Sequence, residues 1–175
     1  MWWPVTHGPG EVAPKRPEVT ILFKPDPIEF GEYILKPKAE IKGKFRVLKK
    51  RRYYFDEYVS LAPVDVLIGW GEMSDERNLN FLYFEADDRT YDINITRPPI
   101  PIERIRKQTL LFHFIPSNND IDQKIKHLRE GQAMNIEAYI VDVDQENGLQ
   151  WNSSEISAAR KDYSNLILWV KKIHD

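Results

Sequence analysis

Residues 38–47 alternate strictly between polar and apolar side chains. Ala39, Ile41, Gly43, Phe45 and Val47 share one face, and Lys38, Glu40, Lys42, Lys44 and Arg46 share the other. A period of two over ten residues predicts a half-buried strand in an antiparallel sheet. The strand continues into residues 49–52, which are all basic, and into the aromatic residues 53–55.

Shorter patterns predict the remaining elements. Residues 79–86 and 90–96 alternate around Asp87, Asp88 and Arg89, which predicts a hairpin. Further strands are expected at residues 19–23, 109–115, 132–144, 149–151 and 165–173. Pro101 suits the start of a short helix at residues 102–107. A second helix is expected after Asn118 or Asn119, with Ile121, Ile125 and Leu128 on one face and Gly131 just past its end.

Strands therefore outnumber helices. The pattern predicts a mainly β (α+β) fold, an antiparallel barrel or sandwich with one or two short helices. The second half is compared with an oligonucleotide-binding-type barrel. That comparison concerns the fold alone and implies no function.

Proline density divides the chain. Residues 1–37 contain seven of the twelve prolines, and proline lacks a backbone donor, so this segment is expected to be extended. We expect residues 1–32 to form a Pro-rich, poorly packed arm or linker and residues 33–175 to form one globular β-rich domain. The adjacent Trp2 and Trp3 are either the interfacial edge of a membrane anchor absent from this chain or a chance pair of exposed aromatics.

Composition removes several functional classes. The chain has no cysteine, which excludes disulfides, thiol catalysis and cysteine metal sites. Its formal net charge of −2 provides no overall field for a polyanion. The four histidines have no metal-ligand spacing, and no glycine-rich phosphate loop is present, so neither a metal nor a cofactor is expected.

Residues 61–75 combine an apolar run, two glycines around a tryptophan and a Ser-Asp pair. Gly69 and Gly71 permit positive φ or close backbone approach, so the backbone sets the position of Trp70. Two interpretations are open. Trp70 is either a buried residue at a bend or a residue at the rim of a ligand groove.

This stretch resembles the hallmark of an uncharacterised family of bacterial membrane-tethered proteins, written Leu-x-Pro-Val-Asp followed by Gly-Trp-Gly-x-Met-Ser-Asp. His113-Phe114-Ile115-Pro116 is similar to the family's His-x-Ile-Pro element, and Trp151-Asn152-Ser153-Ser154 to its Trp-x-Ser-Ser element. The resemblance implies a membrane-spanning segment before the arm, a periplasmic location and an envelope partner. It implies no chemistry. Relatives carry Arg-x-Asp-Thr-Gly and then Cys-Glu, whereas this chain has Arg160-Lys161-Asp162-Tyr163-Ser164 and no cysteine.

Three functions follow as hypotheses. The first is a non-enzymatic binding or assembly domain with an unknown protein or envelope partner. The second is a small-ligand receptor or hydrolase with a groove near Trp70, His113 and Trp151. Its candidate ligand-binding residues are Trp70, Asp75, His113, Trp151, Ser153, Arg160 and Asp162. For a hydrolase, Ser153 or Ser154 could form a triad with His113 and Asp162, but no Gly-x-Ser-x-Gly element supports one.

The third hypothesis is nucleic-acid binding through the basic strand. Residues 36–52 contain nine basic residues and one acid, beside three aromatics, and such mixtures occur on surfaces that bind single strands. Its candidate residues are Lys42, Lys44, Arg46 and Arg51. A solvated strand face with lysines guarding an edge explains the same pattern, so nucleic acid is not the expected partner.

Overall fold

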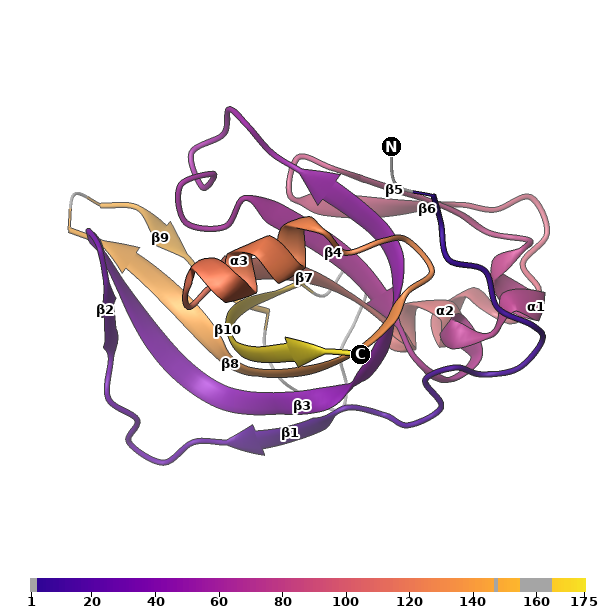
Figure 1. The fold of residues 1–175 in the computed structure, drawn as a ribbon, viewed down its shortest axis with the longest axis horizontal. Helices are drawn as coiled ribbons and strands as arrows, with labels where there is room; N and C mark the ends of the chain where they lie inside the picture. The colour runs from indigo at the N-terminus through magenta and orange to yellow at the C-terminus, as the bar shows by residue number, and fades with distance from the viewer. Residues whose placement is uncertain (1–2, 147, 155–164) are drawn as a thin grey trace.

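The computed structural model describes residues 3–146, 148–154 and 165–175 (Figure 1). Its strands are β1 (Glu18–Ile21), β2 (Ile28–Phe30), β3 (Tyr33–Arg52), β4 (Val64–Gly69), β5 (Tyr83–Asp87), β6 (Thr90–Asn94), β7 (Thr109–Pro116), β8 (Ala133–Gln145), β9 (Gln150–Trp151) and β10 (Asn165–His174). Its helices are α1 (Glu76–Leu79), α2 (Ile102–Lys107) and α3 (Asn119–Lys126), with a 3₁₀-helix at Gly71–Ser74. The fold is mainly β, as the patterns predicted.

Five strands close into a ring. β3 pairs with β4, β4 with β7, β7 with β10, β10 with β8, and β8 again with β3. The predicted barrel is therefore present. Four of these pairings are antiparallel, but β10 runs parallel to β7, so the sheet is mixed rather than purely antiparallel. β3 is long enough to pair with β8 along most of its length and with β4 at its end.

Alternate residues of the ring strands fill its interior. Phe45, Phe112 and Phe114 are fully buried there and meet edge to face, Phe45 to Phe112 at 5.2 Å between ring centroids. α3 covers one end of the ring (Figure 1). Its Ile121 and Ile125 belong to the same cluster, as the predicted apolar face requires.

The outer face of the ring is also covered. Leu67 and Leu111 pack beneath the β5–β6 hairpin and α2 in a second cluster. Ile115 and Ile167 pack with Trp151 and the residues before β4 in a third. Strands buried on both faces explain why β4 and β7 are nearly continuous apolar runs instead of alternating ones.

The hairpin at Asp88 and Arg89 and the helix Ile102–Lys107 are confirmed, as are the strands near 109–115, 132–144 and 165–173. The sequence patterns did not identify β2, β4, α1 or the 3₁₀-helix as elements. β4 was recognised as an apolar run only, because periodicity is lost when both faces are buried. α1 spans four residues, too few for a helical repeat to be visible.

The first residues of the chain lie against the barrel. Val5 N–H donates to the carbonyl oxygen of Glu130 at 2.8 Å, and His7 bonds the carbonyl oxygen of Gly131 at 2.7 Å. Ala13 is fully buried, and its carbonyl oxygen accepts from Gly71 N–H at 2.8 Å. Parts of the expected arm are thus bound to the barrel, because prolines prevent regular structure but leave backbone groups free to bond elsewhere, while most of residues 3–32 are exposed.

β1 forms the predicted edge strand on β3. No helix in the described part of the chain is both long and apolar enough to cross a bilayer.

Candidate functional site: a buried charge cluster and a surface pocket

Two polar side chains interrupt the neighbouring strands β4 and β7 at the same level. Asp65 lies opposite His113 in the register, and both point to the outer face of the ring. Nδ1 of His113 lies 2.8 Å from Oδ1 of Asp65. Asp65 is fully buried and His113 is 1% exposed. Oδ2 of Asp65 and Nε2 of His113 are buried with no hydrogen-bond partner among the described residues.

Arg89 neutralises this site from the tip of the β5–β6 hairpin. Its guanidinium binds Asp56 through two bonds of 2.6 and 2.9 Å, and Asp65 at 2.8 Å. It also donates to the carbonyl oxygen of Ala62 at 2.7 Å. The hydrogen bond from Arg89 holds the pKa of the Asp56 carboxyl below its usual value. The Arg89 guanidinium therefore joins the β5–β6 hairpin to the loop before β4.

The backbone of the hairpin tip is held in a sparsely populated conformation. Asp88 and Arg89 have φ of +51° and +61°, in the left-handed region where Gly or Asn is usual. Arg89 N–H donates to the hydroxyl of Tyr53 at 3.0 Å. Burial raises the pKa of that Tyr53 hydroxyl to about 12. The contacts of the Arg89 side chain thus compensate for an unfavourable turn residue.

Aromatic rings seal the cluster. Arg89 stands over the ring of Tyr53 at 4.0 Å to the centroid. Tyr58 stacks on Trp151 at 4.0 Å, and Trp151 lies 4.7 Å from the His113 ring. The predicted proximity of His113 and Trp151 is confirmed.

The cluster has the chemistry of an oriented imidazole without access for a substrate. In acid–base sites a carboxylate fixes the ring of a histidine, as Asp65 does here. A catalytic base must also reach a substrate atom, and His113 is enclosed by Asp65, Trp151 and the neighbouring strands. In this geometry Asp65, Arg89 and His113 hold the hairpin and loops to the barrel.

The predicted grouping of Trp70 with His113 and Trp151 is wrong. Trp70 belongs to the interior cluster and packs edge to face on Phe45 at 6.4 Å. The backbone N–H of Trp70 donates to the carbonyl oxygen of Gln108. Gln108 lies five residues before His113, a separation of about 16 Å along a strand. The two side chains also point to opposite faces of the ring, so Trp70 is a core residue, one of the two interpretations left open.

The glycines around Trp70 act as expected. Gly71 has φ of +58°, and a Cβ at Gly69 would come within 2.4 Å of the carbonyl oxygen of Met73. The chain therefore turns sharply from β4 into the 3₁₀-helix, which places Ser74 and Asp75 against the N-terminal segment.

Ser153 is buried, and its hydroxyl is fully engaged with the backbone. It donates to the carbonyl oxygen of Val141 at 2.7 Å and accepts from Ile167 N–H at 2.8 Å. It therefore links β8 to β10 and is not placed as a nucleophile. Arg160 and Asp162, the other members of the predicted group, lie outside the described residues.

Asp75 anchors the N-terminal segment. It is 4% exposed, and Oδ1 accepts from Gly10 N–H at 3.2 Å and from Arg77 N–H at 2.9 Å. The side chain of Arg77 binds both carboxylate oxygens, at 2.7 to 3.1 Å. These hydrogen bonds, first of all those from Arg77, hold the pKa of Asp75 far below its ordinary value.

Replacing Asp75 by Asn should therefore remove stability that depends on pH. Because the carboxyl pKa is lowered in the folded state, its contribution is present above about pH 4 and is lost as the pH falls below it. Urea denaturation should show a larger deficit for Asp75→Asn at pH 7 than at pH 3. The matched change Asp88→Asn, at an exposed turn, should show a nearly constant difference. Equal deficits for Asp75→Asn at both pH values would contradict this role.

The basic strand is largely neutralised by acids. Its ion pairs are Lys36–Asp144, Lys38–Asp142, Lys42–Glu40, Lys42–Glu137, Arg46–Glu76, Lys49–Glu130 and Arg51–Asp87. Three of these acids, Glu137, Asp142 and Asp144, come from β8, the antiparallel neighbour of β3. Lys44 is exposed. The charge run in the sequence is thus the basic half of a paired, solvated face.

Arg46 departs from the predicted polyanion-binding group. It points outward as the alternation requires, but the Ser74–Glu76 segment covers it, so that it is only 4% exposed. One of its Nη atoms donates to the carbonyl oxygen of Ser74 at 3.3 Å and the other binds Glu76. Its Nε is buried with no partner among the described residues. Outward direction in a strand does not guarantee contact with solvent.

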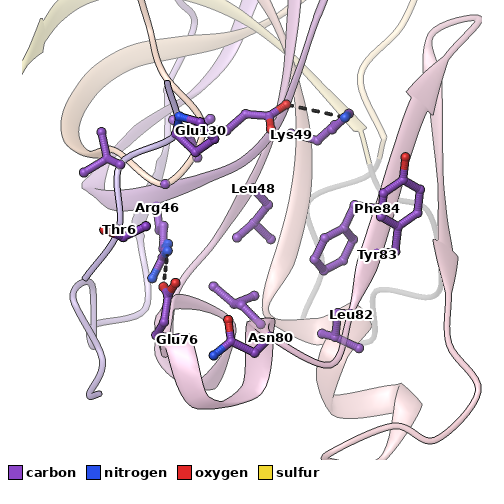
Figure 2. A pocket seen from close by; sticks show the side chains of 15 residues that line it. Thr6, Arg46, Leu48, Lys49, Glu76, Asn80, Leu82, Tyr83, Phe84 and Glu130 are labelled. Atoms are coloured by element: carbon purple, nitrogen blue, oxygen red, sulfur yellow. Dashed lines mark hydrogen bonds and ion pairs between the residues drawn. The ribbon is translucent and has the colours of Figure 1, made fainter. Parts of the chain in front are cut away.

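A pocket of about 230 Å³ lies next to Arg46 (Figure 2). Figure 2 shows the Arg46–Glu76 ion pair on one side and Leu82 and Phe84 on the other, with Leu48 and the Lys49–Glu130 ion pair between them. Pro4, Val5 and Thr6 of the N-terminal segment form part of its wall. The pocket is separate from the Asp65–His113 cluster.

Sequence reasoning missed Asp56, Asp65 and Arg89 as a group. A signal was present: Asp65 and His113 are single polar residues within otherwise apolar strands, and Arg89 occupies a turn position that favours Gly. Nowhere in the described ranges do three His, Asp or Glu side chains group closely enough to hold a metal ion. Comparisons with family models, curated proteins and solved structures gave no match to this chain.

Proposed function

We propose that this chain is a non-enzymatic binding and assembly domain of a membrane-tethered protein of the bacterial envelope, facing the periplasm. The tether and location rest on the resemblance of the Leu61–Asp75 stretch to the bacterial membrane-tethered family. The binding role rests on what the surface offers. The groups that could do chemistry, Asp65, His113 and Ser153, are buried in structural hydrogen bonds.

The observation that carries this proposal is a set of exposed apolar side chains. Ile21 and Phe23, on and just after β1, are 67% and 88% exposed, and Phe55 in the loop after β3 is fully exposed. Ile21 and Phe23 belong to one short segment, and neighbouring exposed apolar residues typically mark protein-contact surfaces. They contrast with the ion-paired β3–β8 face, which offers a partner little unpaired charge.

The ring topology, together with the segments that cover its outer face, argues against a nucleic-acid partner. In chain order the ring strands are β3, β4, β7, β8 and β10, and the first pairs with both the second and the fourth, which agrees with an oligonucleotide-binding-type barrel. We extend that comparison from the second half to residues 33–174. Such barrels bind ligands on the outer face of their second and third strands. Here that face carries Asp65 and His113 and is covered by the hairpin and Trp151.

Site-specific photo-crosslinking in membranes of the producing bacterium tests the proposal. A photoreactive phenylalanine at Phe23 or Phe55 should give a discrete adduct with an envelope protein. The same group at Lys172, whose side chain is 69% exposed on the ion-paired face, should give none. Absence of adducts at both phenylalanines would contradict a binding role. Release of the native protein from membranes by alkaline carbonate would contradict the tether.

The pocket beside Arg46 favours a second candidate function, a receptor for a small ligand. A pocket lined by two ion pairs and by apolar side chains suits a small zwitterion with an apolar side chain, such as a free amino acid. Leucine at millimolar concentration should then raise the melting temperature of the protein. Leu48→Trp, which fills the pocket, should abolish the shift. No shift with any of the twenty amino acids would contradict this candidate.

A further inference from the structure

The end of β6 carries an acceptor pattern for N-linked sugars. Asn94 is followed by Ile95 and Thr96, and Asn-x-Thr is the pattern whose asparagine oligosaccharyltransferases join to a sugar. Bacterial enzymes of this class also read an acidic side chain two residues before the asparagine, and Asp92 occupies that position. Residues 92–96 thus contain the whole bacterial pattern, Asp-x-Asn-x-Thr. So short a pattern is informative only where the fold presents it.

The fold presents the three side chains that such an enzyme reads. Asp92, Asn94 and Thr96 are exposed, whereas the intervening Ile93 and Ile95 are half-buried and pack against the cluster beneath the hairpin. The alternation of β6 therefore continues past its end, with the polar side chains directed outward. Within the described ranges, no hydrogen bond holds the side chain of Asn94 or of Thr96.

The backbone at Asn94 is the end of regular structure. Asn94 is the last residue of β6, and its register partner is Tyr83, the first residue of β5. Residues 95–101 form neither helix nor strand. A transferase must seat the acceptor residues in its own groove, and a strand end that runs into an exposed loop can be drawn out with the loss of few hydrogen bonds.

The stability of the hairpin does not explain Asp92. Asp92 lies directly opposite Glu85 in the β5–β6 register, and both are exposed. Like charges that face each other across an antiparallel pair are unfavourable. In the described part of the chain neither carboxylate forms an ion pair that would offset this repulsion. An acid in this position therefore suits recognition by another protein better than it suits the fold.

A second Asn-x-Ser sequence provides an internal contrast. Asn152 is exposed and is followed by Ser153 and Ser154, but Gln150 stands where the acid would be. The hydroxyl of Ser154 accepts from Asn165 N–H at 3.1 Å, and Ser154 N–H donates to the carbonyl oxygen of Asn165 at 2.9 Å. These bonds fix the sequence to β10, so it cannot enter an enzyme without breaking that junction.

We propose that Asn94 is an N-glycosylation site whose sugar donor is an oligosaccharide carried on a polyprenyl pyrophosphate. The amide nitrogen of Asn94 bonds to the anomeric carbon of the first sugar and loses one proton. The bond from that carbon to the pyrophosphate oxygen breaks, and the polyprenyl pyrophosphate leaves with the electron pair. The inference goes beyond the proposed binding role but rests on the proposed periplasmic location, where such donors face the enzyme.

The fold tolerates a sugar at this position. Asn94 lies five residues after Arg89, which is about 16 Å along a strand, so the Arg89 contacts at the other end of the hairpin stay intact. The glycosylated and the bare protein should therefore melt at nearly the same temperature.

Transfer to the purified, folded chain is the first test. The chain is incubated with a purified bacterial oligosaccharyltransferase and an undecaprenyl-pyrophosphate-linked oligosaccharide. The intact mass should increase by one glycan, and tandem mass spectrometry should place the glycan on Asn94. Asn94→Gln should abolish the transfer, and Asn152→Gln should leave it unchanged. A wild-type chain that accepts no glycan, or accepts it at Asn152, would overturn the proposal.

Variants at the flanking positions test how the site is read. Asp92→Asn and Thr96→Val should each lower the transfer rate by about tenfold or more, because each removes a polar contact with the enzyme. Thr96→Ser should retain the transfer. Thr90→Val is the matched control, since Thr90 is exposed on the same strand outside the pattern. All four variants should melt near the wild-type temperature. Equal rates for Thr96→Val and Thr90→Val would refute the assignment.

The native protein separates this inference from the proposed location. Protein purified from membranes of the producing bacterium should carry a glycan on Asn94, and protease added to spheroplasts should digest the domain. A digested domain whose Asn94 is bare would refute the modification and leave the periplasmic location standing. A domain protected from the protease would refute the location itself.

Discussion

Replacing Arg89 by Met should lower the free energy of unfolding by about 3–5 kcal/mol. The change keeps much of the side chain's length but removes the charge that Asp65 and Asp56 share. Asp65 is fully buried, and without Arg89 it would retain only His113 as a side-chain partner among the described residues. An uncompensated buried carboxylate is strongly destabilising. Urea denaturation at pH 7 measures the difference.

Arg51→Met is the matched control. Arg51 is paired with one aspartate, Asp87, instead of two, and its side chain is 50% exposed, so its loss should change stability by less than about 1 kcal/mol. The double variant Asp65→Asn/Arg89→Met should be more stable than Arg89→Met alone, because the unpaired charge is gone. An Arg89→Met protein as stable as Arg51→Met would show that the cluster does not hold the hairpin in place.

Trp70→Ala should lower the free energy of unfolding by about 3–5 kcal/mol, because it leaves a cavity beside Phe45 in the ring interior. Gly69 and Gly71 hold the backbone in a sharp turn, so the site has little freedom to collapse around the cavity. A change of this size is a large part of a domain's total stability. Chemical denaturation followed by circular dichroism measures it without relying on the tryptophan itself.

Trp3→Ala is the control for Trp70→Ala. Trp3 is 70% exposed, and its replacement should change stability by no more than about 0.5 kcal/mol. His113→Gln should lie between the two, because glutamine retains a donor for Asp65 but not the ring that packs near Trp151. If Trp70→Ala unfolded within a few tenths of a kcal/mol of wild type, Trp70 would not be a core residue.

Local patterns in the sequence were sufficient for the parts of the fold that depend on near neighbours. The alternation in residues 38–47 identified β3, and the polar turn at Asp88 identified the β5–β6 hairpin. The apolar face of α3 was visible at helical spacing. Each of these follows from the periodicity of side chains along one element, which is a property of the local chain.

The partners of individual side chains were decided only by the tertiary structure. Asp65 in one strand, His113 in another and Arg89 in a hairpin are brought together by strand pairing across 24 to 48 positions. The same long-range packing separated Trp70 from His113 and buried Arg46 beneath Ser74. Sequence periodicity specifies which way a side chain points from its own strand. What lies opposite is set by register and by the segment that covers the strand, which no local pattern contains.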